Sequence, residues 1–186
     1  MNIRALSVLV LLLFSALPIS AQAHQHKSPA HKEANVETIT VKASELSDSA
    51  GLQYVGGIVE KATIATYLER LKTMETDSFE TLRAGQASRD HGKFHVTFIN
   101  PFEIKEVSEQ QVHQLLASET VFDFQVKGLG RVIKGNGKAY FIVLSSAEAD
   151  AMRKHLGLSP KDFHITLGFS PSDIYGVRKD ESTLVD

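Results

Sequence analysis

Phe94–Ile99 reads FHVTFI and Phe163–Gly168 reads FHITLG, so two distant stretches carry nearly the same order of residue types. Each begins with an aromatic residue, followed by histidine, a β-branched residue, threonine and another apolar residue. This mixture is typical of a buried strand that carries two polar side chains. Because side chains alternate between the faces of a strand, the histidine and threonine of each stretch share one face and the β-branched residue lies on the other.

Four polar side chains would line one pocket if the fold placed these strands together: His95, Thr97, His164 and Thr166. Histidine exchanges protons near neutral pH, and hydroxyl groups donate hydrogen bonds to phosphoryl oxygens. The set is therefore sufficient to cleave a phosphodiester without a metal ion. A single H-x-T motif is common by chance, and it is the match over six residues in similar surroundings that favours a shared site.

The N-terminal segment, residues 1–23, has the pattern of a secretory signal peptide. Arg4 provides a positive charge, Ala5–Leu17 is an apolar run, and Ala21–Ala23 has the small residues of a cleavage site. The apolar run is shorter than the roughly 20 residues of a membrane span. We expect a periplasmic or secreted protein with no stable membrane association after cleavage, an uncleaved anchor being the alternative.

Residues 24–50 are expected to form a flexible tail, because their first part is polar and contains His24, His26 and His31. A histidine-rich tract can also bind metal ions, which is the alternative interpretation of this segment. Residues 51–178 are expected to form the folded domain, followed by a C-terminal tail at residues 179–186.

Composition narrows the classes of partner and of chemistry. The chain has no cysteine, which excludes thiol catalysis and disulfides, and it has 20 basic and 22 acidic side chains. A protein that binds long nucleic acid usually has more basic than acidic side chains. We therefore expect a small anionic substrate, no long nucleic acid partner and a monomeric protein.

The order of strand, helix and motif strand occurs twice. A strand at 54–60 and an amphipathic helix at 63–74 precede the first motif strand, and a strand at 140–144 and a helix at 146–157 precede the second. Two such repeats bury their apolar faces against each other. This predicts an α+β, bilobal fold in which two pseudo-symmetric strand-helix-strand repeats place antiparallel sheets around a central cleft.

Local signals place the connecting elements. Residues 75–92 have a mixed polar and apolar composition. Phe79 and Leu82 indicate a further helical turn within them. Ser108 with Gln111 is a capping-box pattern that opens a helix. Gly135–Gly137 (GNG) is typical of a tight hairpin turn.

The paired H-x-T strands, with apolar flanks and a repeat around each, resemble the 2H phosphoesterase superfamily, and most closely its Swiss Army Knife RNA repair-like branch. The resemblance covers about residues 52–177. It implies a bilobal α+β sandwich with both motifs in a central cleft, and thus a 2H phosphoesterase-like domain at 51–178. Members of the family open or form cyclic phosphodiesters such as 2′,3′-cyclic nucleotides, cyclic ADP-ribose phosphates and RNA ends.

From this resemblance and the chemistry of the four residues, we expect a hydrolase that opens a cyclic phosphodiester of a small nucleotide or RNA end. His164 is assigned as base and His95 as acid, although pseudo-symmetry permits the reverse. Thr97 and Thr166 would hold the phosphoryl oxygens. No metal or cofactor is expected, because a catalytic zinc ion usually has three protein ligands and no carboxylate cluster accompanies His91 and His95.

Two other classes of function stay open: a non-catalytic binding protein for a phosphorylated ligand, and a metal-handling protein that uses the histidine-rich tail. Four cations near the predicted loops and hairpin could steer a phosphate, although such residues are usually solvated surface. They are Arg89, Lys93, Arg131 and Lys138.

Overall fold

The computed structural model describes residues 37–185. Its strands are β1 (Thr38–Lys42), β2 (Ser44–Ser47), β3 (Gln53–Val59), β4 (Phe94–Ile99), β5 (Val121–Lys134), β6 (Gly137–Ser145) and β7 (Phe163–Ser170). Its helices are α1 (Ala65–Met74), α2 (Phe79–Asp90), α3 (Glu109–Ala117) and α4 (Ala147–His155), with short 3₁₀ turns η1 (Glu103–Glu106) and η2 (Glu181–Thr183). None of the helices among these residues is long and apolar enough to cross a membrane.

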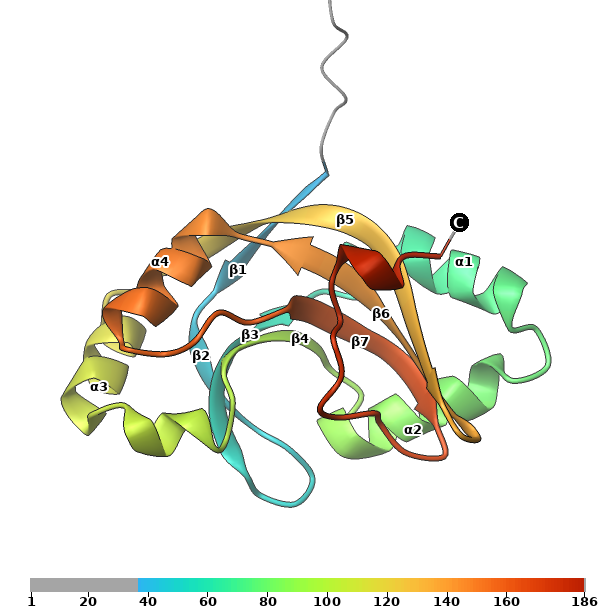
Figure 1. Cartoon of the computed structure of the whole chain (residues 1–186), viewed down its shortest axis with the longest axis horizontal. Helices are drawn as coiled ribbons and strands as arrows, with labels where there is room; N and C mark the ends of the chain where they lie inside the picture. The colour runs from blue at the N-terminus through green and yellow to red at the C-terminus, as the bar shows by residue number, and fades with distance from the viewer. Residues whose placement is uncertain (1–36, 186) are drawn as a thin grey trace, which may run out of the picture. The chain divides into compact units, whose positions relative to one another are not determined.

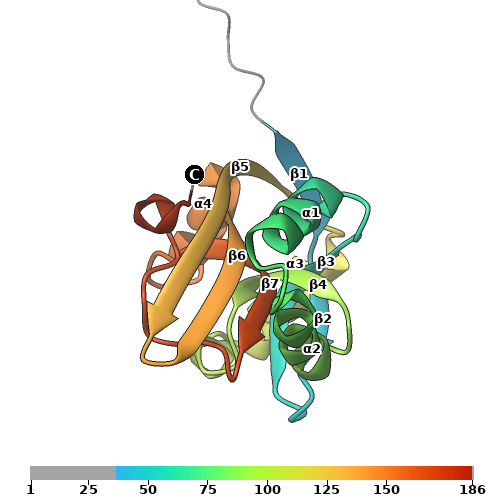
Figure 2. The ribbon, with the colours of Figure 1, turned by 90° about the vertical axis from the view of Figure 1, so that its right-hand side faces the viewer.

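The seven strands form one antiparallel sheet in the order β1-β5-β6-β7-β4-β3-β2 (Figures 1 and 2). The two motif strands, β4 and β7, are neighbours in this sheet. On its other side, β4 pairs with β3 and β7 pairs with β6. The β6-β7-β4-β3 segment is therefore symmetric about the boundary between the motif strands.

This symmetry confirms the predicted repeat, because β3 and β6 are the first strands of the two strand-helix-strand units. Helices α1 and α2 connect β3 to β4, and α4 connects β6 to β7. The α+β class and the antiparallel pairing are confirmed. The two repeats share one continuous curled sheet, whereas the expectation was of sheets in the plural, because the motif strands bond directly to each other.

The core lies on the face of β4 and β7 opposite to the histidines. Val96 and Ile165 are fully buried there, and Leu68 and Leu71 of α1 belong to the same cluster. A row of phenylalanine rings also contributes: centroids lie 5.0–5.8 Å apart along the series Phe122, Phe98, Phe124 and Phe163. The alternation predicted for the motif strands is therefore correct.

The expected tail at 24–50 is too long, because the sheet already begins at Thr38 and includes β1 and β2. Ile39 and Val41 of β1 are buried in the core, and β1 comes so close to β3 that a Cβ added to Gly57 would lie 2.3 Å from a methyl of Val41. The expected signal peptide and the three tail histidines lie outside the described residues.

Residues 179–185 of the expected C-terminal tail at 179–186 also pack against the domain. Lys179 is buried, and the backbone N–H of Val185 donates to the carbonyl of Leu129 in β5. The segment satisfies backbone groups of the sheet and covers apolar side chains, which explains why it is ordered although its composition is polar.

Helix α2 is longer than the single turn expected from Phe79 and Leu82. It lies against β7, where both partners have glycine at the contact: Gly168 faces Leu82, and Gly85 faces the backbone of Phe169. A Cβ at Gly85 would be 2.3 Å from the Phe169 carbonyl oxygen, so only glycine permits this approach. The close packing brings the C-terminal end of α2 beside the motif strands.

Two expected local features are confirmed. Ser108 caps α3 in a capping box with Gln111. Residues 135 and 136 form the turn between β5 and β6. The register of β5 against β6 shifts between Val126 and Gly128.

A buried arginine holds the end of β4. Arg153 of α4 is 1 % exposed, and its guanidinium donates to the carbonyl of Phe98 at 2.6 Å and to Glu103 at 2.7 Å. The Glu103 carboxylate also accepts from the backbone N–H of Asn100. This arrangement ties α4 and η1 to the strand that carries His95 and Thr97.

We predict that Glu103→Gln lowers the free energy of unfolding by about 3 kcal/mol, because it leaves the Arg153 charge buried without its counter-ion. Urea unfolding measures the change. The matched control is Glu119→Gln, which removes a carboxylate from the exposed Lys42–Glu119 pair and is expected to lower the free energy of unfolding far less, because solvent screens exposed ion pairs. Equal losses in the two variants would contradict this account of Arg153.

Candidate active site

One backbone pairing positions the four predicted site residues. Val96 of β4 lies directly opposite Ile165 of β7 in antiparallel register. Because partners in such a pair run in opposite directions, Thr166 is the residue opposite His95, and His164 is the residue opposite Thr97. The structure therefore brings all four predicted site residues onto one face, around the Val96–Ile165 pair.

The spacing within this group follows from sheet geometry. Residues directly opposite each other have Cβ atoms about 4.5–5.5 Å apart, and diagonal neighbours have Cα atoms about 7–8 Å apart. His95 and His164 are such a diagonal pair. His95, His164 and Thr97 are partly buried, and Thr166 is buried at 7 % exposure. A phosphate-sized group between the imidazoles would thus lie beside both hydroxyls.

Aromatic rings flank both histidines. The Tyr54 ring of β3 lies 5.3 Å from the His95 ring, and the Phe141 ring of β6 meets His164 edge-on at 5.6 Å. Each ring comes from a strand next to a motif strand. These contacts limit the orientations that the imidazoles adopt, and they remove part of each ring from water.

The tautomer of His164 is determined by its hydrogen bond. Its Nδ1 lies 2.9 Å from the carbonyl oxygen of Asp162, which only accepts, so Nδ1 carries the hydrogen. The lone pair of the neutral ring is then on Nε2. Burial, the largest cause, and the nearby Lys179 ammonium together lower the pKa of His164 to about 3. His164 is thus a neutral imidazole near neutral pH.

The surroundings of His95 differ in charge. Burial lowers its pKa, while the Asp90 carboxylate raises it and the Arg89 guanidinium lowers it. Asp90 stands at the end of α2, immediately before the left-handed cap residue His91. The helix end thus brings a carboxylate to His95, whereas His164 faces a cation.

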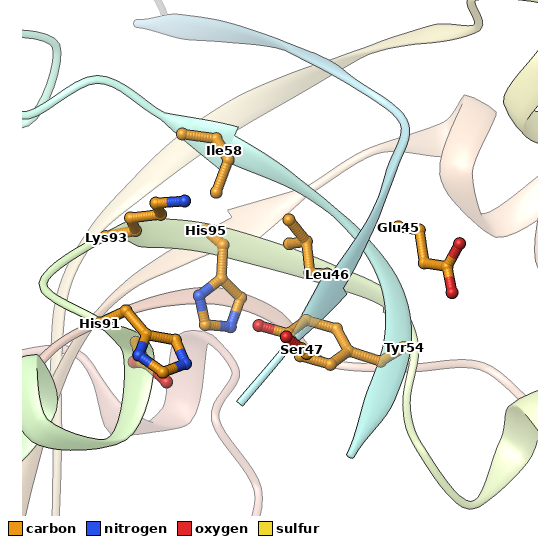
Figure 3. Close-up of a pocket in the computed structure, with 9 residues that line it drawn as sticks. Glu45, Leu46, Ser47, Tyr54, Ile58, His91, Lys93 and His95 are labelled. Atoms are coloured by element: carbon orange, nitrogen blue, oxygen red, sulfur yellow. The ribbon is translucent and has the colours of Figure 1, made fainter. Parts of the chain in front are cut away.

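A pocket of about 170 Å³ opens beside His95 (Figure 3). Figure 3 shows the His95 imidazole between His91 and Tyr54, with Leu46 and Ile58 above it in the same view. The pocket is small compared with the several hundred Å³ of a typical site for a drug-sized ligand. Its lining consists of Glu45, Leu46, Ser47, Tyr54, Ile58, Asp90, His91, Lys93 and His95.

A line of alternating charges runs beside the site. Arg89 donates to both oxygens of Asp90 at 2.6 and 2.7 Å and pairs with Asp173 on its other side. Asp173 in turn accepts from the Lys179 ammonium at 3.2 Å. Asp90, Asp173 and Lys179 are each at most 9 % exposed, and Arg89 also covers the Phe169 ring.

Of the four cations considered from the sequence, Arg89 belongs to this line and Lys93 lines the pocket. Lys138 pairs with Glu75, and Arg131 is exposed. Sequence reasoning missed Asp90, Asp173 and Lys179, because a single charged residue in a polar segment has no local pattern. The only available signal was the position of Asp90 at the end of a helix close to the first motif.

Among residues 37–185, no group of three or more His, Cys, Asp or Glu side chains is arranged to hold a metal ion. The histidines considered for metal capture, His24, His26 and His31, lie outside this range.

Comparison with protein families gives a match over most of the domain. Residues 59–175 match the family model described as the Swiss Army Knife, 2H phosphoesterase domain. The chain belongs to the 2H phosphoesterase family. The matched range contains both H-x-T strands and helices α1 to α4, and it ends before Lys179. The general activity of this family is that of a phosphoesterase, a class of hydrolase. No curated protein and no solved structure matches the chain.

Because His164 stays neutral in the folded protein near neutral pH, we predict a specific loss of stability in mild acid. The unfolded chain binds a proton at this residue near pH 6.5, whereas the folded chain does so only near pH 3. Unfolding therefore becomes easier as the pH falls through 6.5, and this residue alone should cost about 2 kcal/mol between pH 7 and pH 5.

Urea unfolding of the native protein and of His164→Gln at both pH values measures this cost. The variant is expected to lose about 2 kcal/mol less than the native protein over the interval. His155→Gln, at an exposed position on α4, is the matched control and should retain the native pH dependence. The same slope in the native protein and in His164→Gln would contradict a depressed pKa at His164.

Proposed function

We propose that this protein opens a cyclic phosphodiester of a small nucleotide, such as a 2′,3′-cyclic nucleotide, or of an RNA end, by acid–base catalysis with two histidines and without a metal ion. The observation that supports this most strongly is the register of β4 against β7. It places two imidazoles diagonally across from each other with a hydroxyl opposite each. Membership of the 2H phosphoesterase family supports the same class of reaction.

In the proposed reaction, water attacks the phosphorus atom while Nε2 of His164 takes up one of its protons. The new P–O bond forms as one P–O bond of the ring breaks. His95 gives its proton to the departing ribose oxygen, which becomes a hydroxyl group. The product is a phosphomonoester, and proton exchange with solvent returns both histidines to their starting forms.

The hydroxyls of Thr97 and Thr166 donate hydrogen bonds to the non-bridging oxygens in this mechanism, where negative charge builds up in the transition state. The Nδ1–H tautomer of His164 supports its role as base, because it leaves a lone pair on Nε2 that can accept a proton. The partner assignment, His95 as acid, requires a protonated imidazole on the side where Asp90 lies.

The pocket beside His95 supports a small substrate. It has a volume of about 170 Å³, and it is lined by a tyrosine ring, two apolar side chains and several polar or charged ones. A ribose or part of a base is the group that fits such a space, and the slight acidic excess of the chain disfavours long nucleic acid. We propose a monomer that needs no cofactor.

We also propose that this protein is exported from the cytoplasm. The signal-peptide pattern at residues 1–23 supports export to the periplasm or outside the cell. Amino-terminal sequencing of the protein from the periplasmic fraction and the medium tests it, with His24 as the expected first residue. Intact residues 1–23 on membrane-bound protein would favour an anchor.

We predict that His95→Gln and His164→Gln each lower turnover of 2′,3′-cyclic nucleotides by about 100-fold or more, the scale of general acid–base catalysis. Purified protein is assayed with EDTA on a panel of cyclic phosphodiesters, with chromatographic identification of the 2′ or 3′ product. His155→Gln is the control. Full turnover in either site variant would overturn the mechanism, and turnover that EDTA abolishes would overturn its metal independence.

We predict that Thr97→Val and Thr166→Val each lower kcat by about 100-fold, because each removes a donor that is needed in the transition state. The valine side chain has a similar shape, so the strands should keep their register. Thr40→Val, on the exposed edge of β1, is the control. A rise in KM with unchanged kcat would instead assign the hydroxyls to ground-state binding.

The same preparations separate the other classes of function. Binding of a cyclic nucleotide without turnover, measured by calorimetry, would favour a binding protein. Metal uptake that is lost when residues 24–36 are deleted, together with no effect of either histidine variant, would favour metal handling.

A further inference from the structure

The two histidines are equivalent by the symmetry of the sheet, yet their charged surroundings are opposite in sign. The line Asp90–Arg89–Asp173–Lys179 has a carboxylate at one end and an ammonium at the other. Each link is an ion pair, and the end groups are 5 % and 6 % exposed. Charges buried to this extent act on their neighbours with little screening by water.

The carboxylate end lies at His95. Asp90 and His95 line the same pocket, and Asp90 is the last residue of α2. Its carboxylate is held by Arg89 and by the side-chain amide of Gln86, which donates at 3.0 Å. Close packing of α2 on β7 fixes this helix end, so Asp90 has a defined position relative to the imidazole.

The ammonium end lies at His164. The Nζ atom of Lys179 is 5.4 Å from the centre of the Phe141 ring, and that ring meets His164 at 5.6 Å. The backbone provides a second link, because the N–H of Lys179 donates to the Asp162 carboxylate while the Asp162 carbonyl accepts from His164. The C-terminal segment is thereby held against the loop that precedes β7.

We propose that this line of charges assigns the catalytic roles of the two histidines: Asp90 stabilises the protonated form of His95, which is the acid, and Lys179 disfavours protonation of His164, which is the base. The inference rests on the proposed two-histidine function and deepens it. Asp90 and Lys179 act through the histidines, so they are positioning residues and not catalytic ones.

The other charged groups near each ring modify this effect without reversing it. Around His164, Lys161 acts in the same direction as Lys179, whereas Asp173 and the hydrogen bond to Asp162 oppose it. Apart from burial, Lys179 has the largest influence on the pKa of His164 and lowers it.

Around His95, Arg89 opposes Asp90, and Asp90 has the larger influence and raises the pKa. Three more titratable side chains, Glu45, His91 and Lys93, line the pocket around His95. The net influence of the neighbouring charges therefore has opposite signs at the two imidazoles.

Lys179 lies beyond the residues that match the family model, which end at position 175. The H-x-T pairs lie within that match, whereas the ammonium comes from the C-terminal segment. The symmetric part of the site thus comes from the matched repeats, and one of the charges that makes it asymmetric comes from outside them.

The pH dependence of kcat/KM tests the proposal. Loss of the ammonium in Lys179→Met should make His164 easier to protonate, so the acidic limb of the profile moves up by about one pH unit. Loss of the carboxylate in Asp90→Asn should make His95 harder to protonate, so the alkaline limb moves down by a similar amount. If the roles were reversed, Lys179→Met would raise the alkaline limb and Asp90→Asn would lower the acidic one.

Three control variants separate charge from packing. Lys179→Arg keeps the cation and should retain the native limbs. Lys42→Met and Asp123→Asn remove similar charges from exposed positions and should leave the profile unchanged. A uniform loss of rate in Lys179→Met and Asp90→Asn, with both limbs in their native places, would show that the two residues are only structural and would overturn the proposal.

NMR titration of the histidine side chains gives a readout that does not require turnover. In Asp90→Asn the His95 signals should titrate about one pH unit lower than in the native protein, and in Lys179→Met the His164 signals should titrate about one unit higher. Unchanged titrations would overturn the proposal even in an active enzyme. If no cyclic substrate is turned over, the proposed function fails, while shifted titrations still establish the charge effect. If Lys179→Met does not fold, the titrations of Lys179→Gln and Asp90→Asn test the proposal instead.

Discussion

The antiparallel pairing of Val96 with Ile165 is the constraint on which the rest of the structure depends. These residues are fully buried, and they hold together two strands that lie far apart along the chain. A shift of one residue in this register would turn the histidines toward the core and Val96 toward solvent. Burial on one face therefore determines the positions of the polar side chains on the other. The site is a consequence of how the core packs.

Several contacts outside the two strands protect this register. Arg153 bonds the carbonyl of Phe98 at the end of β4, and α2 packs on β7 at Gly168. Both contacts are close and directional, so neither tolerates sliding of a strand. The contacts of α4 and η1 with the end of β4 thus limit the movement of His95 and Thr97.

The sequence alone was sufficient to predict that the histidine and threonine of each motif share one face of the sheet, because alternation along a strand is a local property. It also predicted the repeat, since strand and helix periodicities are visible in each half. It could not predict the register between β4 and β7. That register depends on contacts between residues in different halves, including shifts in pairing next to Gly56 and Phe141.

The predicted ends of the domain were wrong for a different reason. Thr38–Lys42 does alternate between polar and apolar residues, but the polar composition around it favoured a tail. No sequence pattern indicated that Lys179 is buried. It stands between Arg178, whose side chain is 77 % exposed, and Asp180, while its own side chain is 7 % exposed. Only the path of the C-terminal segment distinguishes these neighbours.

Partial burial lowers the pKa of both imidazoles, whereas the charges beside the two rings differ in sign. Removing a histidine from water disfavours its charged form, so burial alone would leave the two rings neutral and alike. Acid–base chemistry needs them to differ. A carboxylate near one ring and an ammonium near the other creates that difference, and joining the two through Arg89 and Asp173 leaves each buried charge paired. A symmetric scaffold therefore holds two imidazoles in opposite electrostatic surroundings, and each of the four charges Asp90, Arg89, Asp173 and Lys179 is paired.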